Sequence, residues 1–165
     1  MTKEELTVKI QEYFSDKITE INKDSYDLII VIDSSSFMNV MGILKNNKDF
    51  DFDYLMCLSG ADYPPERLEV VYHLFSLEKN HRICVKTGLS RENPVVSSVV
   101  SLWRGAEWHE REAYDLFGIT FEGNPDLRRM FLPEDFQGHP LRKDYSSPDV
   151  IPSPDVKELI RTGKS

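Results

Sequence analysis

Few side chains in this sequence have catalytic or metal-binding potential. Cys57 and Cys84 each lie within a short apolar run without a neighbouring base, and two thiols cannot hold an iron–sulfur cluster or a cysteine-rich zinc site. His109 precedes Glu110, but the sequence lacks the second histidine one helical turn later that a zinc-protease helix presents. It also lacks a glycine-rich loop for phosphates or dinucleotides. We therefore expect no metal, flavin or NADH on this chain.

A dense group of charged side chains lies in residues 103–118, which read WRGAEWHEREAYDLFG. Glu107 and Arg111 stand in the favourable i,i+4 orientation, and Gly118 follows where a helix can end in a left-handed conformation. These features predict a helix over residues 105–117. Glu110 falls on the apolar stripe of that helix, so we expect its carboxylate to be buried.

Three interpretations of this helix remain open. In the first, the buried Glu110 carboxylate pairs with a nearby arginine, because an unpaired buried charge is costly. The available arginines are Arg104, Arg128, Arg129 and Arg142. In the second, Glu110, Glu112 and Asp115 perturb one another's pKa and perform acid–base chemistry. In the third, the charges form a solvated helix face. We favour an ion-paired interface.

The sequence pattern changes after residue 121. In residues 122–165 proline, glycine and charged residues are dense, the apolar residues lose their period, and Ser-Pro-Asp occurs twice, at 147–149 and 153–155. Asn124, Pro125 and Asp126 form a typical helix start. Such a segment cannot build its own core, so it packs on its own domain, docks on another protein or stays disordered. We divide the chain into an α+β core domain, 1–121, and an extended C-terminal docking segment and tail, 122–165.

Hydrophobic periodicity predicts the elements that position these residues. In order, they are a helix over 2–15, a strand at 27–33, a helix that follows Ser34–Ser36, a strand at 53–59, a hairpin of strands 67–77 and 83–87, and a helix at 95–103. Together they predict an α+β fold with a mostly antiparallel sheet flanked by helices and an extended irregular C-terminal segment.

Composition excludes several classes of partner. The 165 residues carry 20 basic and 28 acidic side chains, a formal charge of −8, which disfavours sequence-independent nucleic-acid binding and attraction to anionic membranes. No stretch approaches the ~20 apolar residues of a spanning helix, and the start is acidic and polar. We expect the chain to remain in the cytoplasm, with membrane contact only through other subunits.

Three motifs, in order and within about forty residues, resemble a known family. They are EREAYDLFG at 110–118, PDLRR at 125–129 and GHPLRKD at 138–144, and they resemble the 30 kDa subunit of the proton-pumping NADH:quinone oxidoreductase, respiratory complex I. A weaker resemblance covers residues 1–145 and includes the Asp-Tyr-Pro at 62–64. The partner-interface and signature residues are Trp108, Glu110, Arg111, Glu112, Asp115, Phe117, Gly118, Pro125, Asp126, Leu127, Arg128, Arg129, Gly138, His139, Pro140, Leu141, Arg142, Lys143 and Asp144.

The resemblance implies a cofactor-free subunit of the hydrophilic arm, on the cytoplasmic face of the inner membrane. It would pack against the large quinone-site subunit and the iron–sulfur subunits, while NADH, FMN, the iron–sulfur clusters and quinone belong to partner subunits. The family usually has histidine where this chain has Asn124, and asparagine can preserve a hydrogen bond there. If Arg128 and Arg129 are surface docking residues, reversing both charges should change the free energy of unfolding by less than about 1 kcal/mol.

Two alternatives remain open. The same motifs fit the equivalent subunit of a related membrane-bound hydrogenase or ferredoxin-linked oxidoreductase, which only the neighbouring subunits would distinguish. The second alternative is a free-standing small enzyme or binding domain. Activity or a bound ligand in the purified chain would support it.

Overall fold

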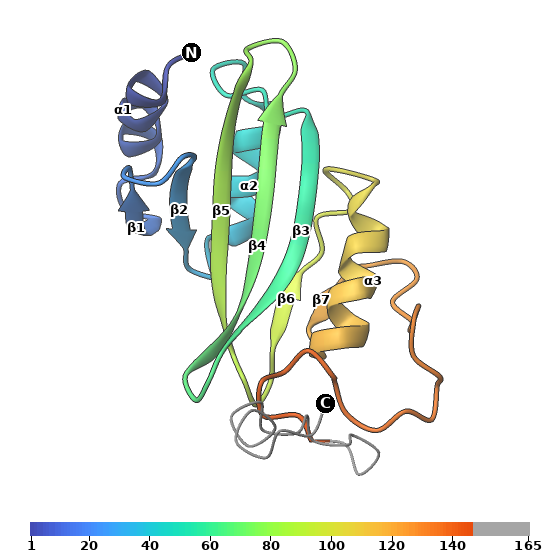
Figure 1. The fold of residues 1–165 in the computed structure, drawn as a ribbon. Coiled ribbons are helices and arrows are strands. Elements are labelled where there is room, and N and C mark those ends of the chain that lie inside the picture. The colour runs from blue at the N-terminus through green and yellow to red at the C-terminus, as the bar shows by residue number, and fades with distance from the viewer. Residues whose placement is uncertain (147–165) are drawn as a thin grey trace, which may run out of the picture.

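A computed structural model describes residues 1–146 of the chain, so both Ser-Pro-Asp repeats lie outside the described residues. The elements are α1 (Lys3–Phe14), β1 (Ile18–Asn22), β2 (Leu28–Ile32), α2 (Phe37–Asn46), β3 (Tyr54–Tyr63), β4 (Arg67–Ser76), β5 (His81–Ser90), β6 (Val95–Ser97), α3 (Ala106–Phe117) and β7 (Thr120–Glu122). Five strands form one sheet in the order β1-β2-β5-β4-β3 (Figure 1). Only the β2–β5 pairing is parallel in that sheet, so the predicted α+β class with a mostly antiparallel sheet is confirmed.

The core lies between one face of the sheet and the helices. Strand β4 shows the alternation clearly, because Leu68, Val70, Tyr72 and Leu74 are buried while the residues between them point to the other face. Phe37 of α2 packs on Tyr72, with ring centroids 5.2 Å apart. Among the described residues, every buried hydrophobic side chain lies between residues 6 and 121.

Strong local signals are confirmed. The Thr2 hydroxyl accepts from the Glu5 amide and the Glu5 carboxylate accepts from the Thr2 amide, so the predicted capping box begins α1. Strands β4 and β5 pair in continuous antiparallel register from Arg67 with Ser90 to Ser76 with His81. No helix within residues 1–146 is long and apolar enough to cross a membrane.

Three local predictions need correction. The edge strand β1 was not predicted, because its mostly exposed residues show no apolar alternation. Residues 95–103 do not form a helix: Val95–Ser97 is strand β6, paired in parallel with β7, as suits β-branched residues, and turns follow. No helix begins at Asn124 either, because its side-chain oxygen accepts from the Asp126 amide at 2.9 Å and closes a turn instead.

Candidate functional site

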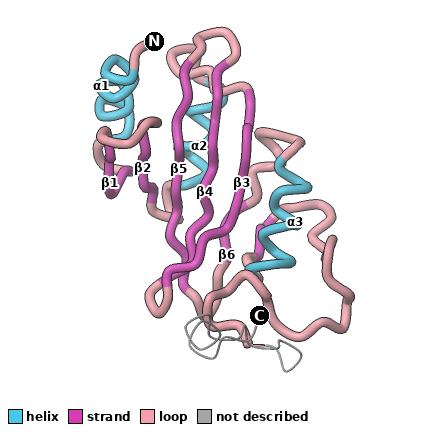
Figure 2. The backbone as a smooth tube through the Cα atoms, viewed as in Figure 1, coloured by secondary structure: helices cyan, strands magenta, loops and turns pink. Residues whose placement is uncertain are grey.

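The three family motifs meet around helix α3. This helix packs beside the edge strand β3, where Gly60 makes room for Phe117: a Cβ at residue 60 would lie 2.6 Å from the Phe117 ring. After β7 the chain turns back and runs around α3 as an irregular loop, without helix or strand up to residue 146 (Figure 2). We call residues 124–146 the C-terminal segment.

Asp115 anchors the first part of the C-terminal segment. Its carboxylate is fully buried and accepts from the consecutive amides of residues 130, 131 and 132 at 2.8–3.1 Å. The guanidinium of Arg129 donates to the same carboxylate at 3.0 Å. Burial raises the pKa of Asp115, but the three amides and Arg129 outweigh burial, so its pKa lies below the usual 3.8. The anchored carboxylate is therefore ionised at neutral pH.

Arg111, one turn before Asp115, holds the preceding residues. Its buried guanidinium donates to the backbone carbonyls of Arg128 at 3.2 Å and Arg129 at 3.3 Å. The same guanidinium lies 4.9 Å from the centre of the Trp108 ring, which is 59% exposed. A buried cation thus fixes both the backbone of the segment and the orientation of an exposed indole.

The GHPLRKD motif caps the C-terminal end of α3. The last carbonyls of a helix have no partners within it, and here three of them contact the segment. His139 Nδ1 lies 3.0 Å from the Asp115 carbonyl oxygen, the Leu141 amide donates to Leu116 at 3.1 Å, and Arg142 Nε donates to Phe117 at 2.7 Å.

Two glycines are required by this cap. Gly118 ends α3 at φ 71°, and a Cβ there would lie 2.4 Å from the His139 ring. Gly138 has φ 86° and faces Tyr145, whose ring would lie 2.8 Å from an added Cβ. Positive φ and close approach therefore both favour glycine at these positions.

The end of the C-terminal segment is tied to strand β3. The buried Asp62 carboxylate pairs with Arg91 and accepts from the Lys143 amide at 2.7 Å. Arg91 also donates to Asp144 at 2.6 Å, and this contact holds the pKa of the Asp144 carboxyl below its usual 3.8. The segment therefore closes on the sheet as well as on α3.

Glu110 has a different environment from the one predicted. It is fully buried, as expected, but it pairs with no arginine in residues 1–146. Its carboxylate accepts from the Ser98 hydroxyl at 2.7 Å, the Val99 amide at 2.8 Å and the Asn124 side-chain amide at 2.8 Å. Burial raises the pKa of Glu110 and these hydrogen bonds partly oppose the shift.

The expected ion pair belongs to Asp115 and Arg129. Arg129 donates to a buried carboxylate, so it is not a surface docking residue, and we expect its charge reversal to lower the free energy of unfolding by more than about 1 kcal/mol. Arg128, with its side chain 73% exposed, keeps the smaller expected change.

The signature residues divide into three groups by their contacts and exposure. The first group is engaged within the chain and consists of Glu110, Arg111, Asp115, Phe117, Gly118, Arg129, His139 and Arg142. Exposed side chains or backbone remain at Trp108, Glu112, Pro125, Arg128, Gly138, Leu141, Lys143 and Asp144. Pro140, Asp126 and Leu127 are half-buried.

Sequence reasoning missed four contributors. Ser98 and Arg91 carry no local motif, and Asp62 was noted only within the Asp-Tyr-Pro resemblance. The side chain of Phe131 is 61% exposed while its own backbone amide donates to Asp115, and only the fold reveals this combination.

Comparison with known proteins identifies the family. Residues 30–150 match the model of the family described as "Respiratory-chain NADH dehydrogenase, 30 Kd subunit". The chain belongs to this family. Two relatives, each named as the C subunit of NADH-quinone oxidoreductase, come from Chloroherpeton thalassium, 39% identical over 86% of this chain, and Roseiflexus castenholzii, 41% identical over 82%. The chain spans 60% of the first relative's length and 79% of the second's.

A solved structure has a similar fold. The trypsin-resistant fragment of Nqo5 superposes with a TM-score of 0.65 at 32% identity, covering 76% of this chain and all of the fragment. The resemblance that the three motifs predicted is therefore confirmed.

Proposed function

We propose that this chain is the 30 kDa subunit of a proton-translocating NADH:quinone oxidoreductase and acts as a structural and assembly subunit of the hydrophilic arm. One observation carries the proposal. The C-terminal segment is irregular, yet Asp115, Arg111 and the end of α3 hold its backbone in one conformation while aromatic, apolar and basic side chains remain exposed on it. A segment fixed in this way loses little conformational entropy when it binds another subunit.

The exposed residues have the composition of a protein interface. Trp108, Phe131 and Leu141 are 50–61% exposed, and aromatic side chains of this kind dominate binding energy where they become buried. The side chain of Arg128 is 73% exposed and binds Asp126 through Nε at 2.9 Å, and its other guanidinium nitrogens can meet a carboxylate of a partner. We assign the large quinone-site subunit as the main partner of this surface, with the iron–sulfur subunits adjacent.

The role of the chain is positional. Electron transfer between clusters, and from the last cluster to quinone, requires fixed relative positions of the subunits that hold them. A rigid α+β domain with a preorganised segment supplies that geometry without chemistry of its own. In this proposal NADH, FMN, the iron–sulfur clusters and quinone are bound by partner subunits, and the chain lies peripherally on the cytoplasmic face of the membrane through those partners.

Co-purification tests the proposal. A tagged full-length chain should retrieve the quinone-site and iron–sulfur subunits from detergent-solubilised native membranes, identified by mass spectrometry, together with NADH:quinone reductase activity. Recovery of a hydrogenase or of ferredoxin-linked subunits would instead support the alternative assembly. A chain that purifies alone from those membranes would refute the assignment.

Interface variants make the test specific. Phe131→Ala and Arg128→Glu change exposed side chains, so the melting temperature should stay within about 2 °C while co-purification falls several-fold. Lys48→Glu is the matched control, because it reverses an exposed charge in the loop between α2 and β3, away from the C-terminal segment. Equal recovery of all three variants would show that the segment is not the interface.

A further inference from the structure

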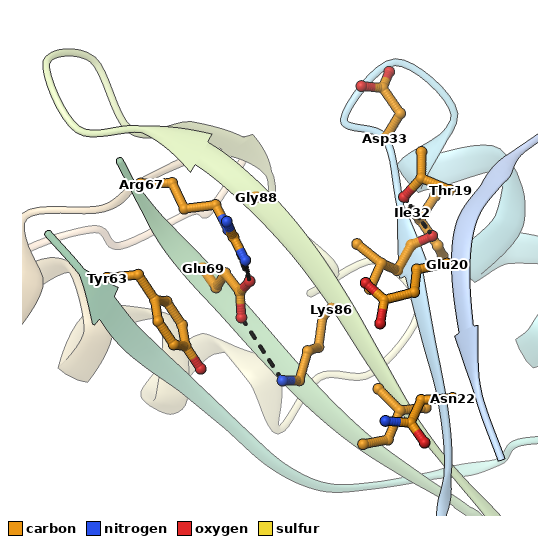
Figure 3. Close-up of a pocket in the computed structure, with 12 residues that line it drawn as sticks. Thr19, Glu20, Asn22, Ile32, Asp33, Tyr63, Arg67, Glu69, Lys86 and Gly88 are labelled. Carbon is orange, nitrogen blue, oxygen red and sulfur yellow. Dashed lines mark hydrogen bonds and ion pairs between the residues drawn. The ribbon is translucent and has the colours of Figure 1, made fainter. Parts of the chain in front are cut away.

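The face of the sheet opposite the core carries a cleft of about 500 Å³. Residues from all five strands line it, and Figure 3 shows Glu69 at its centre, between Arg67 and Lys86. Thr19, Glu20 and Asn22 of β1 lie across the cleft from Tyr63 at the end of β3. This surface is distinct from the face that packs against the helices, because Glu69 alternates with the core residues Leu68 and Val70.

Glu69 is a buried carboxylate with unused hydrogen-bonding capacity. Its side chain is only 5% exposed, and Arg67 binds one oxygen, Oε1, through Nε at 2.9 Å and a second nitrogen at 2.8 Å. Oε2 receives no hydrogen bond from any described residue, and the nearest ammonium, that of Lys86, lies 3.8 Å away. Buried polar atoms in proteins are normally paired, so an unpaired carboxylate oxygen indicates a missing donor.

The charge balance of the cleft specifies the kind of donor. Its lining contains the carboxylates of Glu20, Asp33 and Glu69 against the cations of Arg67 and Lys86. Arg67 is further shared with Glu66, 3.3 Å away at the rim. Negative charge is therefore in excess, which favours a cationic group over an anionic one.

Gly88 leaves the approach to Glu69 open. It lies directly opposite Glu69 in the β4–β5 register, and it is exposed on the cleft side. A Cβ at residue 88 would meet only the Arg67 side chain, at an ordinary contact distance of 3.4 Å. Neither the conformation of the strand nor the packing of the described chain therefore requires glycine there.

The cleft is also continuous with the C-terminal segment. The Tyr63 ring lines the cleft, and it lies 5.3 Å from the guanidinium of Arg67 and 5.8 Å from the ammonium of Lys143, so one ring borders both the cleft and the C-terminal segment. A neighbouring subunit that binds the segment can thus extend a strand or loop into the cleft.

We propose that this cleft binds a cationic side chain, an arginine or lysine, of a neighbouring subunit, with Glu69 Oε2 as its acceptor. The inference rests on the proposed function for the identity of the partner as a subunit. The Lys86 ammonium competes for the same oxygen, and its long flexible stem allows it to turn toward Glu20 or Asp33 when the incoming cation binds.

A peptide titration tests the proposal on the full-length chain alone. The probe is acetyl-Gly-Arg-Gly-amide at low ionic strength, followed by the backbone amide signals of Gly88 and Glu69 in NMR spectra. Saturable shifts at these residues are expected. The isosteric neutral peptide with citrulline in place of arginine should bind at least about five-fold more weakly, since it lacks the charge.

Of three variants, two should weaken binding of the arginine peptide and one should strengthen it. Glu69→Gln should weaken binding of the arginine peptide about five-fold, and Gly88→Val should block it by filling the cleft. Lys86→Met should instead strengthen binding about five-fold because it removes the competing ammonium, an effect that a purely structural Glu69–Lys86 pair would not produce. Melting temperatures verify that each variant is folded.

Two results would overturn the proposal: equal affinity for the arginine and citrulline peptides, or a Lys86→Met variant that binds no better than wild type. Neither result depends on co-purification, so this inference and the proposed function can fail separately.

Discussion

Replacing Asp115 with alanine should release the C-terminal segment from α3. The variant removes a fully buried carboxylate that accepts three backbone amides and one guanidinium. Each charge-assisted hydrogen bond contributes about 1.5–3 kcal/mol, but the four bonds are not additive because they act on one segment. Removing one partner of a buried ion pair costs about 3–5 kcal/mol, and we take this as the expected loss.

The loss should appear mainly as local opening. The segment contributes no fully buried hydrophobic side chain to the core, so it can leave α3 and become hydrated while the sheet remains folded. A destabilisation of about 3–5 kcal/mol raises the population of the open state by two to three orders of magnitude or more. The backbone carbonyls of Arg128 and Arg129, now held by Arg111, become accessible in that state.

Limited trypsin digestion measures this opening. Trypsin cleaves after arginine, and cleavage of a transiently opened segment follows the population of the open state when closing is fast. The rate of cleavage after Arg128, measured by mass spectrometry, should rise at least about 100-fold in Asp115→Ala. Asp115→Asn keeps one acceptor oxygen but loses the charge, so it should fall between the wild type and Asp115→Ala.

Asp135→Ala is the control, because it removes an exposed carboxylate from the same segment without a contact to α3. It should be cleaved at the wild-type rate. If Asp115→Ala were also cleaved at that rate, the carboxylate would not hold the segment, and the explanation that the signature residues anchor the C-terminal segment on α3 would be wrong.

Three further predictions concern buried polar groups. The pKa of Glu110 is raised above 4.5 in the folded state. Its contribution to stability is therefore present below pH 4.5 and is lost as the pH rises through the folded pKa. Glu110→Gln should flatten that part of the curve of unfolding free energy against pH. Burial lowers the pKa of His81 below 6.5, and its Nδ1 has no partner among residues 1–146. The free energy of unfolding should therefore fall as the pH drops below about 6.5. His81→Gln should reduce this fall, measured by urea titrations at pH 7.5 and pH 5.5. Arg91→Ala leaves the buried Asp62 carboxylate without its cation and should lower the free energy of unfolding by about 3–5 kcal/mol, whereas Arg104→Ala, an exposed control, should change it by less than about 0.5 kcal/mol.

Local patterns identified most of the elements around the site. The i,i+4 pair of Glu107 and Arg111 and the terminal Gly118 predicted α3, and Gly118 indeed ends the helix at positive φ. Alternation predicted the β4–β5 hairpin. These features depend on neighbours in the sequence, so the sequence alone is sufficient to find them.

The predictions that failed depend on distant contacts. Val95 and Val99 fit one helical face, but the pairing of β6 with β7, some 25 residues later, decides the conformation of Val95. Likewise Glu110 needed a partner, and charge alone suggested arginine. The structure satisfies it with a hydroxyl, a backbone amide and a carboxamide instead, and the sequence contains no sign that the Val99 amide would face α3.

The burial of so many signature residues changes how mutations in this family should be interpreted. Asp115 and Arg111 contact the chain's own segment, so a variant at either position can abolish assembly without touching a partner. Loss of co-purification therefore identifies a contact residue only when trypsin cleavage after Arg128 stays at the wild-type rate. By this criterion Phe131 is the sharper probe, because its side chain is exposed while its amide stays bound to Asp115 whatever side chain it carries. In the proposed function, the buried signature residues thus preorganise the interface, and the exposed residues between them determine what binds to it.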